Sequence, residues 1–131
     1  MKYIAFAFFS IALLVSCDEE IETKPNYTDI NPNDVEIAVK NETSFQLDSF
    51  NINTSGGNQY YNSISVGSTS AFKTYRFSYD YFYIRFKVNE IVFLRQPIDY
   101  IGEEKIQNGQ YRLKIRDIDT AQATFTYVLD Q

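Results

Sequence analysis

Two groups of tyrosine and basic residues have the chemistry to bind a sugar or an anion. Tyr81, Tyr83 and Arg85 alternate with apolar residues, and so do Arg112 and Lys114 further along the chain. Side chains of a strand point alternately to its two faces, so apolar neighbours in a core would turn these five outward. Arginine binds carboxylate or sulfate through paired hydrogen bonds, and tyrosine offers a flat ring for stacking. We predict that all five share one exposed, ligand-binding sheet surface; the alternative is a solvated sheet face with cross-strand ion pairs.

Carboxylates gather in the loop QPIDYIGEE, which contains Asp99, Glu103 and Glu104. Paired carboxylates carry out glycoside hydrolysis, so an enzyme acting on glycans is one candidate. The same residues also fit a plain turn, in which Pro97 ends a strand, Asp99 caps the turn and Gly102 supplies a positive φ. The chain has no His and one Cys, which excludes His-based relays, His-ligated metals and intrachain disulfides. We therefore predict a protein that is not an enzyme and has no cofactor.

One acidic stretch, DINPND, resembles the start of a calcium-binding EF-hand loop. Oxygen-bearing side chains occupy its first, third and fifth positions. That loop also needs Gly at its sixth position and Glu at its twelfth, where this chain has Asp34 and Lys40. We predict a linker turn here and no metal site.

The single cysteine, Cys17, follows a segment with the character of a bacterial lipoprotein signal. Residues 1–16 combine an early Lys with an apolar stretch that is too short to span a membrane, and they end in Leu-Val-Ser. Together with Cys17 this ending resembles a lipobox, in which the cysteine receives lipid and becomes the mature N-terminus. Two or more acyl chains, palmitate among them, anchor a protein stably. We predict membrane attachment through Cys17; the alternative is an ordinary secretory signal followed by a chance cysteine.

An acidic tether follows the cysteine. Residues 18–36 contain seven acids and one base, with sparse apolar residues, whereas residues 37–131 contain ten acids and ten bases. We interpret residues 17–34 as the acylated cysteine and an extended linker that precedes a neutral domain. The acidic run at 18–20 resembles the signal that exports Bacteroidetes lipoproteins to the cell surface. Under proteobacterial sorting the same run would favour inner-membrane retention, and a periplasm-facing protein is the alternative address.

The domain, residues 35–131, has the pattern of an all-β fold. Short alternating runs rich in β-branched and aromatic residues are separated by turn residues, and no segment has a helical period. About seven or eight strands favour a single antiparallel, immunoglobulin-like β-sandwich, with a small β-barrel as the alternative. A phase shift between Leu47 and Phe50 indicates a bulge, and Asn89-Glu90 indicates a tight hairpin turn. The expected strands cover residues 35–39, 45–52, 64–66, 71–77, 82–88, 91–94, 111–115 and 123–129.

Three motifs of the domain occur in a characteristic order. They are GSTSAF at residues 67–72, QPIDYIGE at 96–103 and NGQY at 108–111. This order resembles a group of small Bacteroidetes surface lipoproteins with a β-sandwich domain. The resemblance implies an outer-membrane, surface-facing address and a single β domain, and it implies no activity. The sequence Asp119-Thr120-Ala121 also resembles the short O-glycosylation motif of Bacteroidetes, so Thr120 is a candidate glycan acceptor.

These features leave two main classes of function. The first is a non-catalytic binding or interaction domain displayed on the cell envelope, with a glycan or an envelope protein as its partner. The second is a structural accessory subunit of an outer-membrane assembly. A nucleic acid is not expected as a partner, because the domain has balanced charge and no nucleic-acid-binding motif.

Overall fold

A computed structural model describes residues 34–131, the whole of the predicted domain. The predictions for the signal segment, for Cys17 and for most of the acidic tether lie outside the described residues. Among the residues described, none belongs to a helix that is long and apolar enough to cross a membrane.

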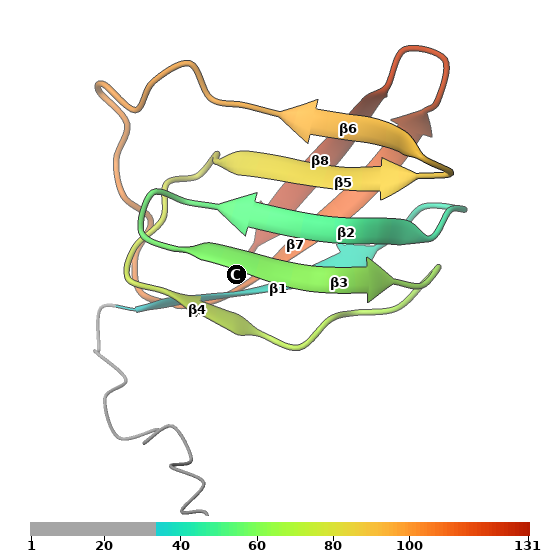
Figure 1. Cartoon of the computed structure of the whole chain (residues 1–131). Coiled ribbons are helices and arrows are strands. Elements are labelled where there is room, and N and C mark those ends of the chain that lie inside the picture. The colour runs from blue at the N-terminus through green and yellow to red at the C-terminus, as the bar shows by residue number, and fades with distance from the viewer. Residues whose placement is uncertain (1–33) are drawn as a thin grey trace, which may run out of the picture.

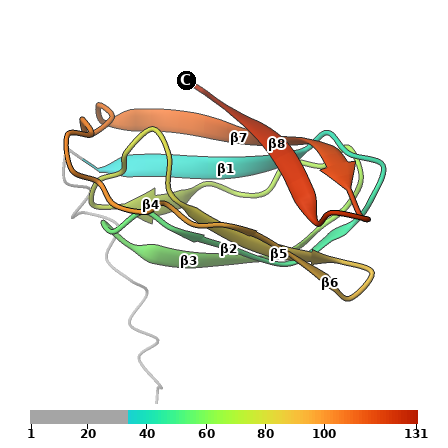
Figure 2. The same cartoon turned by 90° about the horizontal axis from the view of Figure 1, so that it is seen from above.

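The domain is a two-layer β-sandwich of eight strands (Figure 1). One sheet has the order β4–β1–β7–β8 and the other has the order β3–β2–β5–β6. Seen from above, the two sheets lie one over the other (Figure 2). The strands are β1 (Val35–Asn41), β2 (Leu47–Asn53), β3 (Asn58–Ile64), β4 (Lys73–Tyr75), β5 (Tyr83–Val88), β6 (Ile91–Arg95), β7 (Gly109–Asp119) and β8 (Thr124–Asp130).

The predicted sandwich is thus confirmed, and the sheets do not close into a barrel. Strand pairing is antiparallel throughout except between β1 and β7, which run parallel from Val35↔Gly109 to Asn41↔Ile115. This parallel pair joins the first and the seventh strand in the centre of one sheet. It therefore fixes which residues lie beside Arg112 and Lys114.

The core lies between the sheets and is rich in aromatic rings. Phe86 stacks between Phe50 and Phe93, with ring centroids 5.2 and 5.1 Å away. Two buried tyrosines share a hydrogen bond of 2.9 Å between their hydroxyls, and the Tyr61 hydroxyl also contacts the Ile37 carbonyl at 2.8 Å. Burial raises the pKa of both Tyr61 and Tyr75, so the pair stays neutral.

Two predicted local irregularities are present. The pairing of β2 with β3 shifts register between Leu47 and Phe50, and Ser49 there has a φ of 50°. Asn89 and Glu90 have φ values of 47° and 68° and join β5 to β6, with Val88 paired to Ile91. Positive φ at both central residues is the mark of a type I′ hairpin, whose twist matches that of the strands it connects.

Candidate functional site

The predicted surface of five tyrosine and basic residues does not exist as one face. Tyr83 and Arg85 lie on β5, and Tyr81 lies just before it, whereas Arg112 and Lys114 lie on β7 in the opposite sheet. The predicted alternation is correct, because every second residue is buried along β5 and from Tyr111 to Ile115 of β7. The prediction of a shared surface is wrong, because alternation fixes the facing of a side chain within its own sheet only. The structure therefore divides the candidate residues between two locations.

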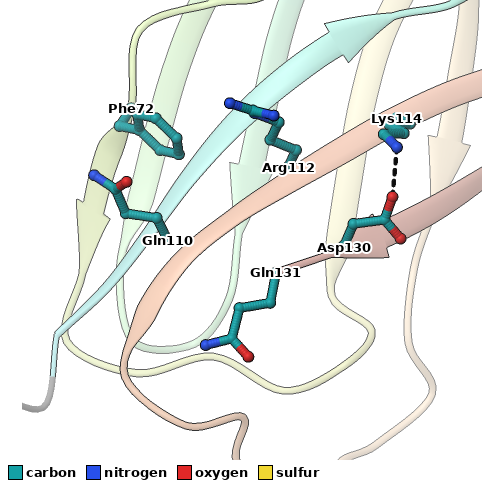
Figure 3. Close-up of a pocket in the computed structure, with 6 residues that line it drawn as sticks. All are labelled: Phe72, Gln110, Arg112, Lys114, Asp130 and Gln131. Carbon is teal, nitrogen blue, oxygen red and sulfur yellow. Dashed lines mark hydrogen bonds and ion pairs between the residues drawn. The ribbon is translucent and has the colours of Figure 1, made fainter.

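The basic half lies at a hollow on the outer face of the β4–β1–β7–β8 sheet (Figure 3). The hollow has a volume of about 350 Å³. Its lining residues come from the β3–β4 connection, from β7 and from the end of the chain: Phe72, Gln110, Arg112, Lys114, Asp130 and Gln131. Arg112 and Lys114 thus stay together, with an aromatic ring and two side-chain amides around them.

Strand register places these side chains beside one another. Gln110, Arg112 and Lys114 alternate with core residues on β7 and so share the outward face. Ala38 is the partner of Arg112 on β1, and Asp130 is its partner on β8. Ala38 faces away from the core, yet none of its surface is exposed, so longer neighbouring side chains cover it.

The charges around the hollow are only partly neutralised. Lys114 Nζ donates to Asp130 Oδ2 at 2.5 Å, and this hydrogen bond lowers the pKa of Asp130. Gln110 Nε2 donates to Glu36 Oε2 at 3.1 Å. Within residues 34–131, no carboxylate lies within ion-pair distance of the Arg112 guanidinium. Arg112 is therefore the cation of this site that is available to a ligand.

The tyrosine half lies at one end of the sandwich, where the β4–β5 and β6–β7 connections meet. Tyr100 stacks on Tyr79 with a centroid distance of 4.4 Å and on Tyr81 with a distance of 5.8 Å. The Tyr81 hydroxyl donates to the Asp99 carbonyl at 2.7 Å. Tyr81 therefore ties the two connections together. Tyr83 is free of such contacts within the described residues and lines a smaller hollow of about 230 Å³ beside Tyr100.

Arg85 is separated from both hollows. Its cross-strand partners are Asn51 on β2 and Leu94 on β6, and its side chain lies on the outer face of the β3–β2–β5–β6 sheet. As with Arg112, no acidic partner lies within ion-pair distance in the part of the chain that the structure describes. Arg85 is thus an arginine of comparable setting outside the larger hollow, which makes it a useful control.

The carboxylates of the QPIDYIGEE loop take part in a turn. Asp99 Oδ1 accepts a hydrogen bond from the Ile101 amide at 3.1 Å, and Gly102 has a φ of 80°. The sequence had predicted that Asp99 caps this turn and that Gly102 supplies its positive φ. Among residues 34–131, no three His, Cys, Asp or Glu side chains lie together as a metal-binding group.

Thr120 lies in the turn between β7 and β8, and its side chain is exposed. Asp119 Oδ1 accepts hydrogen bonds from the amides of Ala121 and Gln122, at 2.9 and 3.1 Å. The acidic residue of the motif thus holds the turn, while the threonine projects from it. Glycosylation of Thr120 stays a prediction.

Several residues of the larger hollow were not identified from sequence. Gln110 had an available signal, because it is two residues before Arg112 on the same strand and must share its face. Phe72 had none, because its place depends on the pairing of β4 with β1, which are far apart in sequence. Asp130 had a weak one, because β7 and β8 are consecutive strands, but the register that sets it opposite Arg112 also depends on the irregularity near their turn.

Comparisons with known proteins identify a fold and no family. No protein-family model and no curated protein matches the sequence. A solved NMR structure of a protein from Eubacterium rectale is similar, with a TM-score of 0.52 and 11% sequence identity. The similarity covers 76% of this chain and 90% of that one. At this identity the likeness supports the shared fold alone.

Proposed function

We propose that this chain is a lipid-anchored envelope protein whose β-sandwich is a non-catalytic domain that binds an acidic saccharide. The observation that carries the proposal is the unpaired Arg112 guanidinium beside the Phe72 ring in the hollow of Figure 3. The anchor is Cys17, on the evidence of the lipobox-like sequence around it. The resemblance to Bacteroidetes surface lipoproteins favours the outer membrane and its outer face as the address.

The residues around the hollow match the groups that an acidic sugar presents. The Arg112 guanidinium is a planar donor that pairs with both oxygens of a carboxylate or sulfate. The Phe72 ring offers a flat apolar surface for the C–H face of a pyranose. The amides of Gln110 and Gln131 supply donors and acceptors for hydroxyl groups. Lys114 is bound to Asp130, so the charges of these two lining residues offset each other.

The test compares two probes that differ by one carboxylate. The full chain is titrated with glucuronate and with glucose, and binding is followed by chemical-shift changes or calorimetry. Glucuronate should bind and glucose should bind at least about tenfold more weakly, since a hydrogen bond to a charged group contributes about 1.5–3 kcal/mol. Arg112→Gln should remove this preference.

Arg85→Gln is the matched control, because it removes the same charge from the opposite sheet. It should leave glucuronate binding unchanged, whereas Phe72→Ala should weaken both probes. If Arg85→Gln and Arg112→Gln reduce glucuronate binding equally, the loss reflects only the removal of a positive charge, wherever it lies on the domain. The proposed site at Arg112 would then be wrong.

A structural or accessory role is the second candidate function. It is favoured by a free sheet edge at β6, where Val92 and Leu94 are exposed. Exposed apolar strand edges are sites at which other chains add a strand. A role of this kind is compatible with ligand binding, since β6 and the Arg112 hollow belong to different sheets.

A further inference from the structure

Exposed apolar side chains concentrate in one segment of the domain. Of the eight large apolar residues that are exposed among those described, five fall within residues 91–101. They occupy β6 and the connection that follows it: Ile91, Val92, Leu94, Ile98 and Ile101. Scattered exposed apolar residues need no explanation, but Val92 and Leu94 share one face of β6 and are both exposed, which makes that strand a candidate interaction surface.

Strand β6 is also an open edge. It pairs with β5 on one side and is the outermost strand of its sheet on the other (Figure 1). Hydrogen-bonded and non-hydrogen-bonded pairs alternate in an antiparallel ladder, and the pair Val88↔Ile91 closes the two-residue hairpin. Val92 and Leu94 are therefore in non-hydrogen-bonded pairs with β5. Their N–H and C=O groups point away from β5, toward the free edge.

The other three edges carry irregularities or a very short strand that discourage strand addition, whereas the single protective feature of β6 is the charged Arg95 at its end. Edge strand β4 has three residues, and β3 and β8 each have a register irregularity against their neighbour. Pairing of β6 with β5 is regular along its whole length, and the strand contains no proline and no lysine. Natural edges are commonly protected by short length, bulges or such residues.

We propose that β6 pairs antiparallel with β6 of a second copy of this chain, about a two-fold axis at Phe93. In this register Val92 of each copy is opposite Leu94 of the other. Since both residues present their backbone groups to the edge, each of the two pairs exchanges two hydrogen bonds, about four in all. The β3–β2–β5–β6 sheets of the two copies then form one continuous sheet.

Side chains and charges of β6 are self-complementary in this arrangement. Val92 and Leu94 of both copies form one apolar cluster on the outer sheet face, where they are otherwise exposed. The strand is preceded by Glu90 and ends in Arg95. Antiparallel pairing brings the acidic end of one strand to the basic end of the other, whereas parallel pairing would bring like charges together. This complementarity favours a second copy over an unrelated strand.

The test is disulfide trapping between two differently labelled chains. Cys17→Ser is introduced into the full chain so that no other thiol is present. One preparation carries Val92→Cys and the other carries Leu94→Cys. In the proposed register these positions are a hydrogen-bonded pair with a Cα separation of about 5.5 Å, within the range that a disulfide spans. Mixed and oxidised, they should give a cross-linked dimer.

The matched control replaces Val92→Cys with Val128→Cys, a comparably exposed valine on the edge strand β8. The Val92–Leu94 mixture should cross-link at least about tenfold faster than the Val128–Leu94 mixture, because only the former holds its sulfurs within bonding range. Equal rates, or cross-linking of Val92→Cys chains mainly with themselves, would overturn the proposed pairing. So would a single mass at that of the monomer when the unlabelled chain is sedimented over a wide concentration range.

Discussion

Asn41 offers a quantitative test of how the domain is held together at the end of β1. Its side chain is fully buried. The amide Nδ2 donates to the carbonyls of Phe45 and Ile64, at 2.7 and 3.0 Å. The oxygen Oδ1 accepts from the backbone amide and the hydroxyl of Thr43, at 2.9 and 2.7 Å. One side chain thus joins the β1–β2 connection to the end of β3.

Asn41→Ala should destabilise the domain by about 2–4 kcal/mol. The Thr43 hydroxyl has one proton to donate, and without Asn41 Oδ1 that proton can go to Phe45 O at 3.0 Å, so these two groups keep a partner. The Ile64 carbonyl and the Thr43 amide lose the partner that Asn41 supplies, and a buried polar group without a partner costs at least about 1–2 kcal/mol. Two such groups give the expected loss, which corresponds to a fall in Tm of very roughly 10–25 °C in a domain of this size.

The free energy of unfolding is measured by urea titration with far-UV circular dichroism, because the chain has no Trp to report by fluorescence. Ser63→Ala is the control. It removes an exposed hydrogen bond of 2.8 Å to Asp48 and should cost no more than about 0.5 kcal/mol. A loss of less than about 1 kcal/mol for Asn41→Ala would show that water or local rearrangement repairs the contacts. That result would refute the inference that the Asn41 side chain holds the β1–β2 connection to the end of β3.

Four further predictions concern the anchor, the address, the β7–β8 turn and the ion pair of the hollow. Cys17→Ser should leave unprocessed precursor or release the chain into the soluble fraction, which cell fractionation measures; normal membrane association would contradict the anchor. Alanine at residues 18–20 should reduce protease accessibility on intact cells without preventing acylation, and unchanged exposure would remove the sorting role. A peptide spanning Thr120 from the native host should carry a glycan by mass spectrometry, and an unmodified peptide would end that prediction. Lys114→Met should lower stability at neutral pH, because the Lys114 hydrogen bond holds the pKa of Asp130 below its unfolded value. This contribution is present above the unfolded pKa and disappears as pH falls through the folded one, so the urea midpoints of the two chains should converge in acid.

The sequence was most informative where a structural feature depends on adjacent residues. Alternation along residues 83–88 correctly gives the buried and outward faces of β5, and the same holds for residues 111–115 of β7. Asn89-Glu90 is correctly identified as a tight hairpin turn, because Asn89 tolerates the positive φ that both residues adopt there. The strand predicted at residues 64–66 is wrong, because it overlaps β3 only at Ile64. Strand β3 is an edge strand in which only Tyr61 and Ile64 are buried, so its first half has the composition of a loop.

Sheet membership could not be obtained in the same way. Arg85 and Arg112 occupy equivalent outward positions in two amphipathic strands, and nothing within either strand says which sheet it joins. That choice depends on partners distant in the chain: β5 pairs with β2, whereas β7 pairs with β1. The β1 residue opposite Arg112 is Ala38, which is 74 residues earlier by the numbering. A local pattern therefore determines facing, and long-range pairing determines neighbours.

This difference explains which part of the predicted surface remained together. Arg112 and Lys114 are two residues apart on one strand, so any strand that buries Leu113 must present both on the same face. A shared surface with Tyr83 required β5 and β7 to be neighbours, but these two strands belong to different sheets. The neighbours of Arg112 and Lys114 in the hollow are instead Phe72, from the β3–β4 connection, and Asp130, from β8. Asp130 forms an ion pair with Lys114, whereas Arg112 has no ion-pair partner among the described residues. The difference between the two cations is therefore set by the position of Asp130 in the folded chain. The proposal of Arg112 rather than Lys114 as the ligand-binding cation therefore depends on the pairing of β7 with β8.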